Sequence, residues 1–324
     1  MPNSETTPTL LSRWGLAALL FGGMFLCYAQ RGALSLATPF LIEERHLSPL
    51  TMGILLSAFF WSYALMQVPA GWLVDHAGVR RTYGWGMLVC AMASSMSGMV
   101  GSLPALTLSR VLLGSGQAVA FPASSRAVAN WFSEGQRGMV TAVYLTGVRL
   151  GQAGVGAASV ILLPRYGWKM LFVVTGLAGL VWAPLWSAFL RRRPFGEARS
   201  EASARPRLSL LGSFALLRHA SVLGIFLGFF AYDYAWYLYT NWLPAYLRVG
   251  RHLSTVEMGV YSSVPFLAMA AIIIVSGLLS DAMIRRGYPE VAIRKTFILV
   301  GLLIACLVVP AGLVKDNRTA DIVI

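Results

Sequence analysis

Three arginines lie inside long apolar stretches of the sequence, where charged residues are rare. Arg31 is the one formally charged residue between Trp14 and Ile42, and Arg110 and Arg149 lie in later apolar stretches. A guanidinium at membrane depth costs at least about 2.5 kcal/mol, so such a residue usually faces a bundle interior or a water-filled path. Two guanidiniums offer planar forks of N–H donors to a carboxylate. The arginines therefore predict an anion site. The alternative is that their side chains reach the headgroups.

The elements that position these arginines are predicted to be membrane-spanning helices. Of the 324 residues, 57% are hydrophobic and 12% are charged, whereas a soluble domain carries roughly 25% charged residues. A span needs about 20 apolar residues, and nine runs qualify: 14–41, 51–74, 82–101, 104–125, 138–163, 170–190, 220–247, 254–280 and 296–314. The sequence therefore predicts an all-α polytopic membrane protein.

The basic residues predict how these spans are oriented. Of the 26 Lys and Arg residues, 16 fall in loops on the side of the N-terminus and 7 in loops on the other side. Cytoplasmic loops carry the excess of basic residues, so we expect a cytoplasmic N-terminus. The basic clusters alternate with apolar runs rather than forming one soluble face, which argues against nucleic-acid binding.

A polar segment rich in Arg, Ser and Pro divides the chain into two unequal parts. We predict an N-terminal six-helix bundle at 1–190, a cytoplasmic linker at 191–218, and a partial C-terminal bundle of three helices at 219–324. Asp75 and Asp281 lie 206 residues apart in similar surroundings, as parallel repeats of a transporter require. Two such halves need more than 400 residues, so the sequence is expected to be a C-terminally truncated form of a twelve-span architecture.

The loop after the second span carries a recognisable motif. Gly71-x-x-x-Asp75-His76-x-Gly78-x-Arg80-Arg81 resembles the loop signature of the major facilitator superfamily, although His76 and Val79 stand where basic residues are usual. Gly71 is expected to allow close helix approach and Gly78 a turn with positive φ. Asp75 is expected to pair with the arginines or a helix N-terminus, and Asp281 is the second copy of this gating-loop aspartate.

Three further stretches narrow the resemblance. They are Leu56–Leu73, Phe121–Arg126 with Asn130–Phe132, and Asn241–Leu247. They are similar to the anion:cation symporter family, which contains bacterial hexuronate, glucarate and galactonate transporters and vesicular glutamate and sialic acid carriers. The resemblance implies two six-helix bundles around a central site, a small organic anion as substrate, and a bacterial cytoplasmic membrane. It places substrate contacts at Tyr28, Arg31, Tyr63 and Arg110. Ordinary aromatic packing is the alternative for the two tyrosines.

Two departures from that family concern the coupling ion. Proton-coupled members carry a carboxylate immediately before the first-span arginine and another seven residues after the fourth-span arginine. This sequence has Gln30 and Gln117 there, and glutamine cannot titrate. Asp233 is the one acid well inside a later span. We interpret it as a counter-charge to Arg149 or a replacement protonatable site, unless it reaches water.

The remaining residues argue against an enzyme. The four histidines (His46, His76, His219, His252) are widely separated and show no zinc-binding spacing. The three cysteines (Cys27, Cys90, Cys306) lie in apolar runs and are expected to be small core residues. We expect no cofactor and no metal.

The alternatives to a sugar-acid carrier are an organophosphate/phosphate exchanger, a non-transporting sensor and an inactive truncated fragment. A co-transported cation and the oligomeric state are left open by the sequence.

Overall fold

A computed structural model describes residues 10–191 and 218–305, and every regular element in these ranges is a helix. Seven helices form the first part: α1 (Leu10–Arg45), α2 (Pro49–Ala77), α3 (Val79–Met99), α4 (Leu103–Gln117), α5 (Ala120–Trp131), α6 (Glu134–Tyr166) and α7 (Lys169–Arg191). The second part has α9 (Ala220–Ala245), a π-helical turn η3 (Tyr246–Gly250), α10 (Thr255–Arg285) and α11 (Glu290–Ala305). The predicted all-α fold is confirmed for the described residues. Most of the predicted linker lies outside them.

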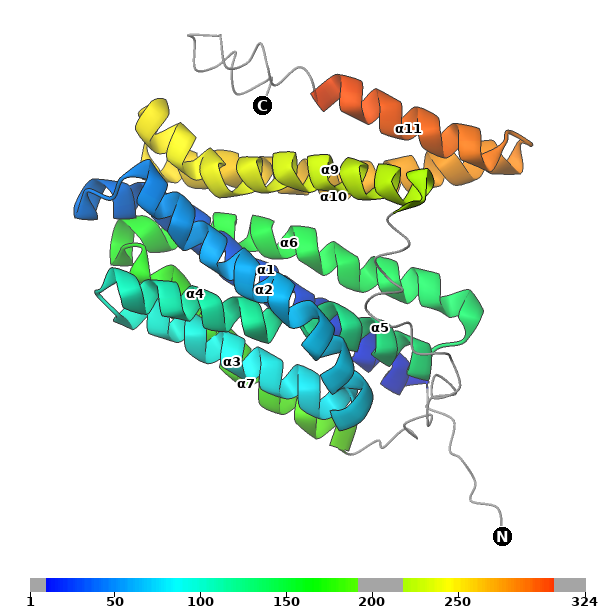
Figure 1. Ribbon diagram of the computed structural model, residues 1–324, viewed down its shortest axis with the longest axis horizontal. Helices are drawn as coiled ribbons and strands as arrows, with labels where there is room; N and C mark the ends of the chain where they lie inside the picture. The colour runs from blue at the N-terminus through cyan, green and yellow to red at the C-terminus, as the bar shows by residue number, and fades with distance from the viewer. Residues whose placement is uncertain (1–9, 192–217, 306–324) are drawn as a thin grey trace.

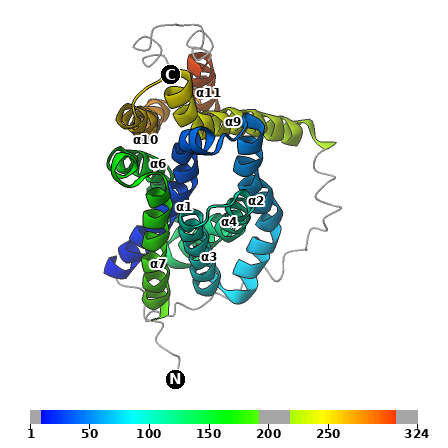
Figure 2. The same ribbon diagram turned by 90° about the vertical axis from the view of Figure 1, so that its left-hand side faces the viewer.

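The helices of the first part pack as one bundle. Within it α3 lies along α7, α1 along α6, and α4 contacts both α2 and α3. The helices of the second part lie together on one side of this bundle (Figures 1 and 2). There α9 packs against α1 and α10 packs along α6, while α11 contacts α10. The two parts therefore meet along α1 and α6.

Local sequence explains where several helices begin and end. Ser48 caps α2 by accepting a hydrogen bond from the Thr51 N–H at 3.1 Å, and Pro49 follows it at the first helical position. Ser254 and Glu257 form a reciprocal capping box at the start of α10. Gly78 separates α2 from α3 with a φ of 79°, so the predicted positive-φ turn is confirmed.

The predicted span at 104–125 is interrupted in the structure at two residues that keep right-handed helical backbone angles. The chain turns at Ala118 and Val119, and α4 and α5 are separate helices. Gly114 and Gly116 precede this turn, and glycine is a poor helix former. A Cβ at Gly116 would lie 2.7 Å from the Gly86 carbonyl oxygen. Gly116 therefore lets α4 pack directly on the backbone of α3, and Gly114 lets it pack on the backbone of α2.

Glycines also set the distance between α1 and α6. A Cβ at Gly147 would lie 2.6 Å from the Phe21 carbonyl oxygen, and Gly151 faces the Phe25 carbonyl in the same way. Such contacts between small residues bring membrane helices together. Gly71, by contrast, has no atom within 4 Å of its Cβ position among the described residues, so the predicted close approach at Gly71 is wrong.

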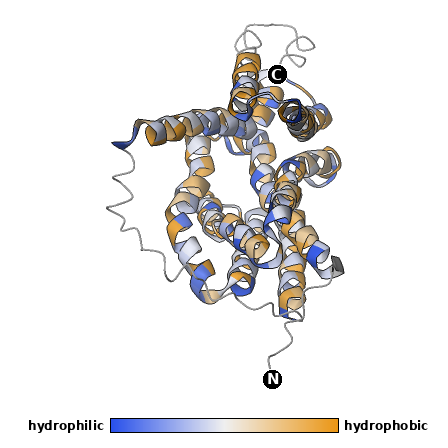
Figure 3. Cartoon of the chain, turned by 90° about the vertical axis from the view of Figure 1, so that its right-hand side faces the viewer, coloured by the Kyte–Doolittle hydropathy of each residue, from blue (hydrophilic) through white to orange (hydrophobic). Residues whose placement is uncertain are grey.

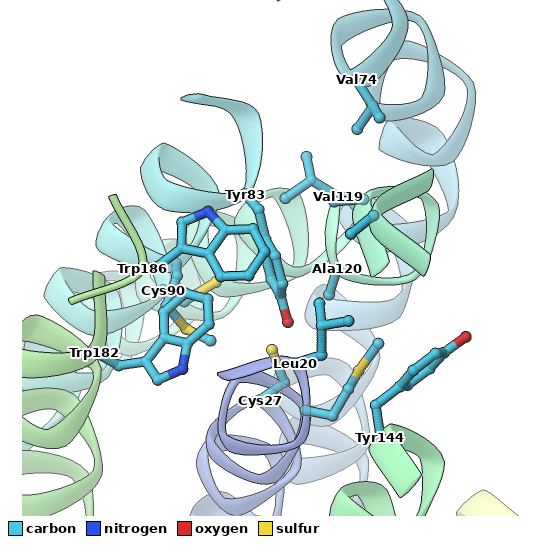
Figure 4. Packing of buried hydrophobic residues seen from close by; sticks show 14 of the residues in the cluster. Leu20, Cys27, Val74, Tyr83, Cys90, Val119, Ala120, Tyr144, Trp182 and Trp186 are labelled. Carbon is cyan, nitrogen blue, oxygen red and sulfur yellow. The ribbon is translucent and has the colours of Figure 1, made fainter. Parts of the chain in front are cut away.

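The core of the first bundle is built from large aromatic side chains. Trp182 and Trp186 stack with ring centroids 5.3 Å apart, and Tyr83 meets both rings edge-on at 5.0 Å (Figure 4). Both indole N–H groups donate to backbone carbonyls, at Leu19 and Arg80, which satisfies their polar atoms inside the bundle. Cys27 and Cys90 are buried and free, as predicted. Cys306 lies outside the described residues.

The outer surface of the molecule is apolar. Six of the described helices, namely α1, α2, α6, α7, α9 with η3, and α10, are long and apolar enough to cross a membrane. The other predicted spans stay predictions, because α3 is rich in Gly and Ser and α4 and α11 are shorter. Many large apolar side chains are exposed, among them Trp61, Leu65 and Ile225, and hydrophobic residues occur along all sides of the molecule in Figure 3. An exposed apolar surface of this extent fits a lipid surrounding.

Candidate anion site between the two parts

Arg31 lies at the centre of an aromatic and amide cluster. Its Nε donates to Gln117 Oε1 at 2.7 Å, and its Nη1 donates to the Tyr237 hydroxyl at 3.3 Å. Its Cζ lies 4.5 to 4.8 Å from three ring centroids, those of Tyr28, Phe59 and Tyr63. Aromatic faces stabilise a cation without neutralising it. No described acidic residue forms an ion pair with Arg31.

The two glutamines hold this arginine in place. Gln117 donates to the Cys27 carbonyl at 2.9 Å and to Gln30 Oε1 at 3.4 Å. Gln30 in turn donates to the Thr175 carbonyl at 3.3 Å. Both glutamines are fully buried, and their amides connect α1, α4 and α7. Because an amide is neutral, the network orients the guanidinium of Arg31 and leaves its charge uncompensated.

Arg110 is a second buried guanidinium in the same region. It is 2% exposed on α4, its Nη2 lies 3.5 Å from Ser97 Oγ, and its Cζ lies 5.1 Å from the Phe172 ring centroid. In the described part of the chain it has no carboxylate partner either. A half-buried Arg31 and a buried Arg110 without counter-charges are costly unless an anion binds between or beside them.

Arg31 and Arg110 line one cavity between the two parts of the chain. About 390 Å³ of space between protein atoms lies there, and this figure includes the solvent at the open side of the cavity. Its other lining residues come from α1, α2, α6 and α9, namely Gly32, Leu34, Ser35, Leu56, Phe59, Phe60, Gln152, Tyr237, Thr240 and Asn241. The cavity is therefore cationic at one end and carries neutral polar groups elsewhere.

Tyr28 and Tyr63 do not line this cavity, although sequence resemblance placed substrate contacts there. Their rings pack against the Arg31 guanidinium, and Tyr63 also stacks on Phe59 at 5.6 Å. The cavity tyrosine is instead Tyr237 on α9. The signal available in the sequence was the run of aromatic residues around Asp233, which does not show which ring faces the partner helices.

The predicted pairing of Arg149 with Asp233 is wrong. Arg149 Nη2 lies 3.4 Å from the Tyr232 hydroxyl, and its Cζ lies 4.1 Å from the Trp236 ring centroid. Residues four apart share one face of a helix, so Tyr232 and Trp236 face α6 together. Asp233 follows Tyr232 in α9 and therefore lies on a different side of the helix. It forms no ion pair with any described residue. The alternative role of Asp233 as a protonatable site stays a prediction.

The gating-loop residues differ from expectation in one respect. Asp75 is exposed and forms no ion pair with Arg80, Arg81 or any other described residue. The turn is held instead by the Thr82 hydroxyl, which donates to the Leu73 carbonyl at 3.1 Å. The side chain of Asp281 lies outside the described set.

Polar contacts that the sequence did not indicate join the two parts beside the cavity. At the C-terminal end of α1, Glu43 pairs with Arg248 of η3 at 3.2 Å. One turn after Arg31 along α1, the Ser35 hydroxyl donates to Asn241 Oδ1 at 3.2 Å. These residues are about 206 positions apart in sequence, so no local pattern could have paired them.

Comparison with known proteins identifies the family. The chain is 28% identical to a D-galactonate transporter of Escherichia coli over 94% of this chain and 75% of that protein. It is 30% identical to a probable L-galactonate transporter of Escherichia coli over 88% of this chain and 65% of that protein. It is 27% identical to a probable sulfoacetate transporter of Cupriavidus necator over 89% of this chain and 69% of that protein.

Solved structures agree on the fold. A bacterial homologue of the human lysosomal transporter Spinster, inward-facing and unoccupied, superposes with a TM-score of 0.78 at 17% identity, covering 98% of this chain and 72% of that one. A peptide transporter gives a TM-score of 0.63 at 16% identity over 93% of this chain and 75% of that one. The sequence model of the Major Facilitator Superfamily matches residues 20–321. This chain therefore belongs to the Major Facilitator Superfamily of membrane transporters and is not an enzyme.

Proposed function

We propose that this protein moves a small organic carboxylate, a sugar acid, across the bacterial inner membrane by alternating access. The observation that carries the proposal is a cavity between the two parts of the chain, lined by two guanidiniums that form no ion pair with a described residue. Relatives named as transporters of D-galactonate, L-galactonate and sulfoacetate support the same class of substrate.

The geometry suits a carboxylate at the Arg31 and Arg110 end. Gln117 Oε1 accepts the hydrogen bond from Arg31 Nε, which leaves N–H groups of the terminal guanidinium nitrogens available to an anion. Arg110 is held by Phe172 and Ser97 and supplies a second fork. Aromatic rings of Phe59 and Phe60 in the cavity wall exclude water and strengthen the charge interaction.

Alternating access needs contacts between the two parts that form and break. Four polar contacts of this kind surround the cavity: Arg31 with Tyr237, Ser35 with Asn241, Arg149 with Tyr232, and Glu43 with Arg248. Each contributes little singly. A hydrogen bond contributes about 0.5–1.5 kcal/mol between neutral groups and about 1.5–3 kcal/mol when one group is charged, and a partly exposed ion pair contributes about 0.2–1 kcal/mol. A substrate that contacts both parts can therefore shift the balance between open and closed states.

Coupling differs from that of carboxylate-bearing relatives. Gln30 and Gln117 bond each other and Arg31 in one neutral network, so proton exchange at these two positions is absent. The protein works as a uniporter or exchanger, or with a cation that binds elsewhere. Its N-terminus faces the cytoplasm, its surroundings are lipid, and its N-terminal bundle and partial C-terminal bundle meet at the cavity.

Radiolabelled D-galactonate uptake into proteoliposomes tests the proposal. Arg31→Ala and Arg110→Ala should each reduce uptake by about 100-fold or more, since an uncompensated partner charge and a lost fork both weaken binding. Arg165→Ala is the matched control, because Arg165 is exposed at the end of α6 and its removal should leave uptake unchanged.

Competition assays separate the alternatives. Unchanged uptake in both cavity variants would refute the anion site. Inhibition by sugar phosphates and not by sugar acids would make the protein an organophosphate exchanger. Binding of D-galactonate without any flux would make it a sensor.

A further inference from the structure

Gln152 has an unusual position beside the arginine cavity. It lies on α6, is 7% exposed, and its Oε1 has no hydrogen-bond partner. A buried amide oxygen without a donor is costly, and most such groups in native structures meet a ligand or water. The side chain lines the cavity that contains Arg31 and Arg110.

Ser262 on α10 is in the same situation. It is 4% exposed and its Oγ has no partner. Its neighbour Ser263 is buried too, but donates to the Gly259 carbonyl at 2.8 Å. Serine hydroxyls inside helices often donate to a carbonyl of the preceding turn. Ser263 makes this hydrogen bond and Ser262 does not.

Both unpartnered groups line a second cavity, which adjoins the first. About 310 Å³ of space between protein atoms lies there, and this figure includes the solvent at the open side. Four residues line both cavities: Gly32, Ser35, Gln152 and Thr240. The two spaces therefore follow each other, with Gln152 at their boundary. A Cβ at Gly32 would lie 2.8 Å from a Val155 methyl carbon, so α1 and α6 pack closely where the two cavities adjoin.

The second cavity contains no charged residue. Its remaining lining is Leu36, Val155, Gly156, Leu243, Pro244, Ser262 and Phe266. Hydroxyl groups suit such a wall, since Gln152 Oε1 accepts and Ser262 both donates and accepts. A second carboxylate would be buried there without a cation, which is strongly unfavourable.

We propose that the second cavity is the subsite for the hydroxylated chain of the substrate, with Gln152 and Ser262 as its recognition residues. The inference rests on the proposed function and sharpens it. The carboxylate lies on Arg31 and Arg110, and the polyol chain extends toward α10. The transporter therefore selects sugar acids with one carboxylate (aldonates) over those with a carboxylate at each end (aldarates).

Uptake of a six-carbon aldonate, competed by an aldarate and by hexanoate, tests this subsite. Ser262→Ala and Gln152→Leu should each raise the KM for the aldonate about fivefold, as expected for one lost hydrogen bond, and leave inhibition by hexanoate unchanged because it has no hydroxyls. Ser263→Ala is the matched control and should leave both values unchanged. Wild-type protein should prefer the aldonate to the aldarate by at least about tenfold.

A gain of function guards against variants that fold poorly. Gln152→Lys places a cation at the boundary of the two cavities, and should shift the preference toward the aldarate. An aldonate KM that is unchanged in both loss variants, or a hexanoate response that changes in parallel with it, would overturn the subsite. If Arg31→Ala abolishes carboxylate binding and Gln152→Leu leaves the aldonate KM unchanged, the subsite alone is refuted. Absence of carboxylate binding to the wild-type protein refutes the proposed function as well.

Discussion

Replacing Gln117 by glutamate tests how a neutral residue beside Arg31 determines coupling. A carboxylate oxygen in place of Gln117 Oε1 would lie 2.7 Å from Arg31 Nε. Opposite charges about 4 Å apart attract by about 4 kcal/mol at an effective dielectric constant of 20. The substitution Gln117→Glu should therefore form a strong ion pair inside the bundle and neutralise Arg31, the proposed anchor of the substrate carboxylate.

The magnitude follows from the same geometry. A substrate carboxylate on the opposite side of the guanidinium would lie on the order of 6–7 Å from the new carboxylate. Repulsion at that distance is about 2.5 kcal/mol, or roughly 70-fold weaker affinity. Protonation of the new carboxylate removes the repulsion. Substrate affinity of Gln117→Glu should therefore rise as pH falls, and an inward proton gradient should drive its uptake.

The assay is uptake of labelled D-galactonate into proteoliposomes at a series of pH values, with and without an imposed pH gradient. Gln117→Leu is the matched control, because it removes the hydrogen bond to Arg31 without adding charge. It should lower affinity by about 1.5–3 kcal/mol, as for a hydrogen bond to a charged group, with no new pH dependence. Equal affinity of Gln117→Glu and wild type at all pH values would refute the reasoning, as would the same pH response in Gln117→Leu.

Three further predictions follow from the packing. Asp233→Asn should leave the pH response of uptake unchanged, as expected for a solvated carboxylate. If the variant instead lost a pH response that the wild type shows, Asp233 on α9 would be the coupling residue. Glu43→Gln should cost under about 1 kcal/mol of stability and should increase the distance between spin labels on the ends of α1 and α9. Glu44→Gln is the control and should leave that distance unchanged, because the Glu44 carboxylate accepts from Trp168 within the first bundle. Gly151→Val should lower the thermal stability in detergent by about 1–3 kcal/mol, because its side chain meets the Phe25 backbone; an unchanged melting temperature would contradict the close α1–α6 packing.

Hydropathy and charge alone predicted the membrane-spanning helices and singled out three arginines inside them; the family resemblance narrowed these to Arg31 and Arg110 as expected substrate contacts. Each prediction depends on the free energy of placing a residue type in its surroundings. A long apolar run is stable in lipid or in a protein interior, and a guanidinium inside such a run is costly and therefore usually functional. Gly78 was predictable for the same kind of reason, because a tight turn with positive φ favours one residue type. The neutral character of Gln30 and Gln117 is likewise a property of the residues themselves.

Only the tertiary structure decided which side chains meet. Gln117 bonds Arg31 across 86 residues of sequence, and Tyr237 bonds it across 206. Asp233 and Tyr237 lie on one helix, yet Tyr237 reaches Arg31 while Asp233 forms no ion pair with a described residue. Gln152 looked unremarkable in sequence, and its unpartnered oxygen became visible only once α6, α1 and α10 enclosed it. Sequence determines the cost of burying a group, but the packing of distant helices decides which partner, if any, offsets that cost.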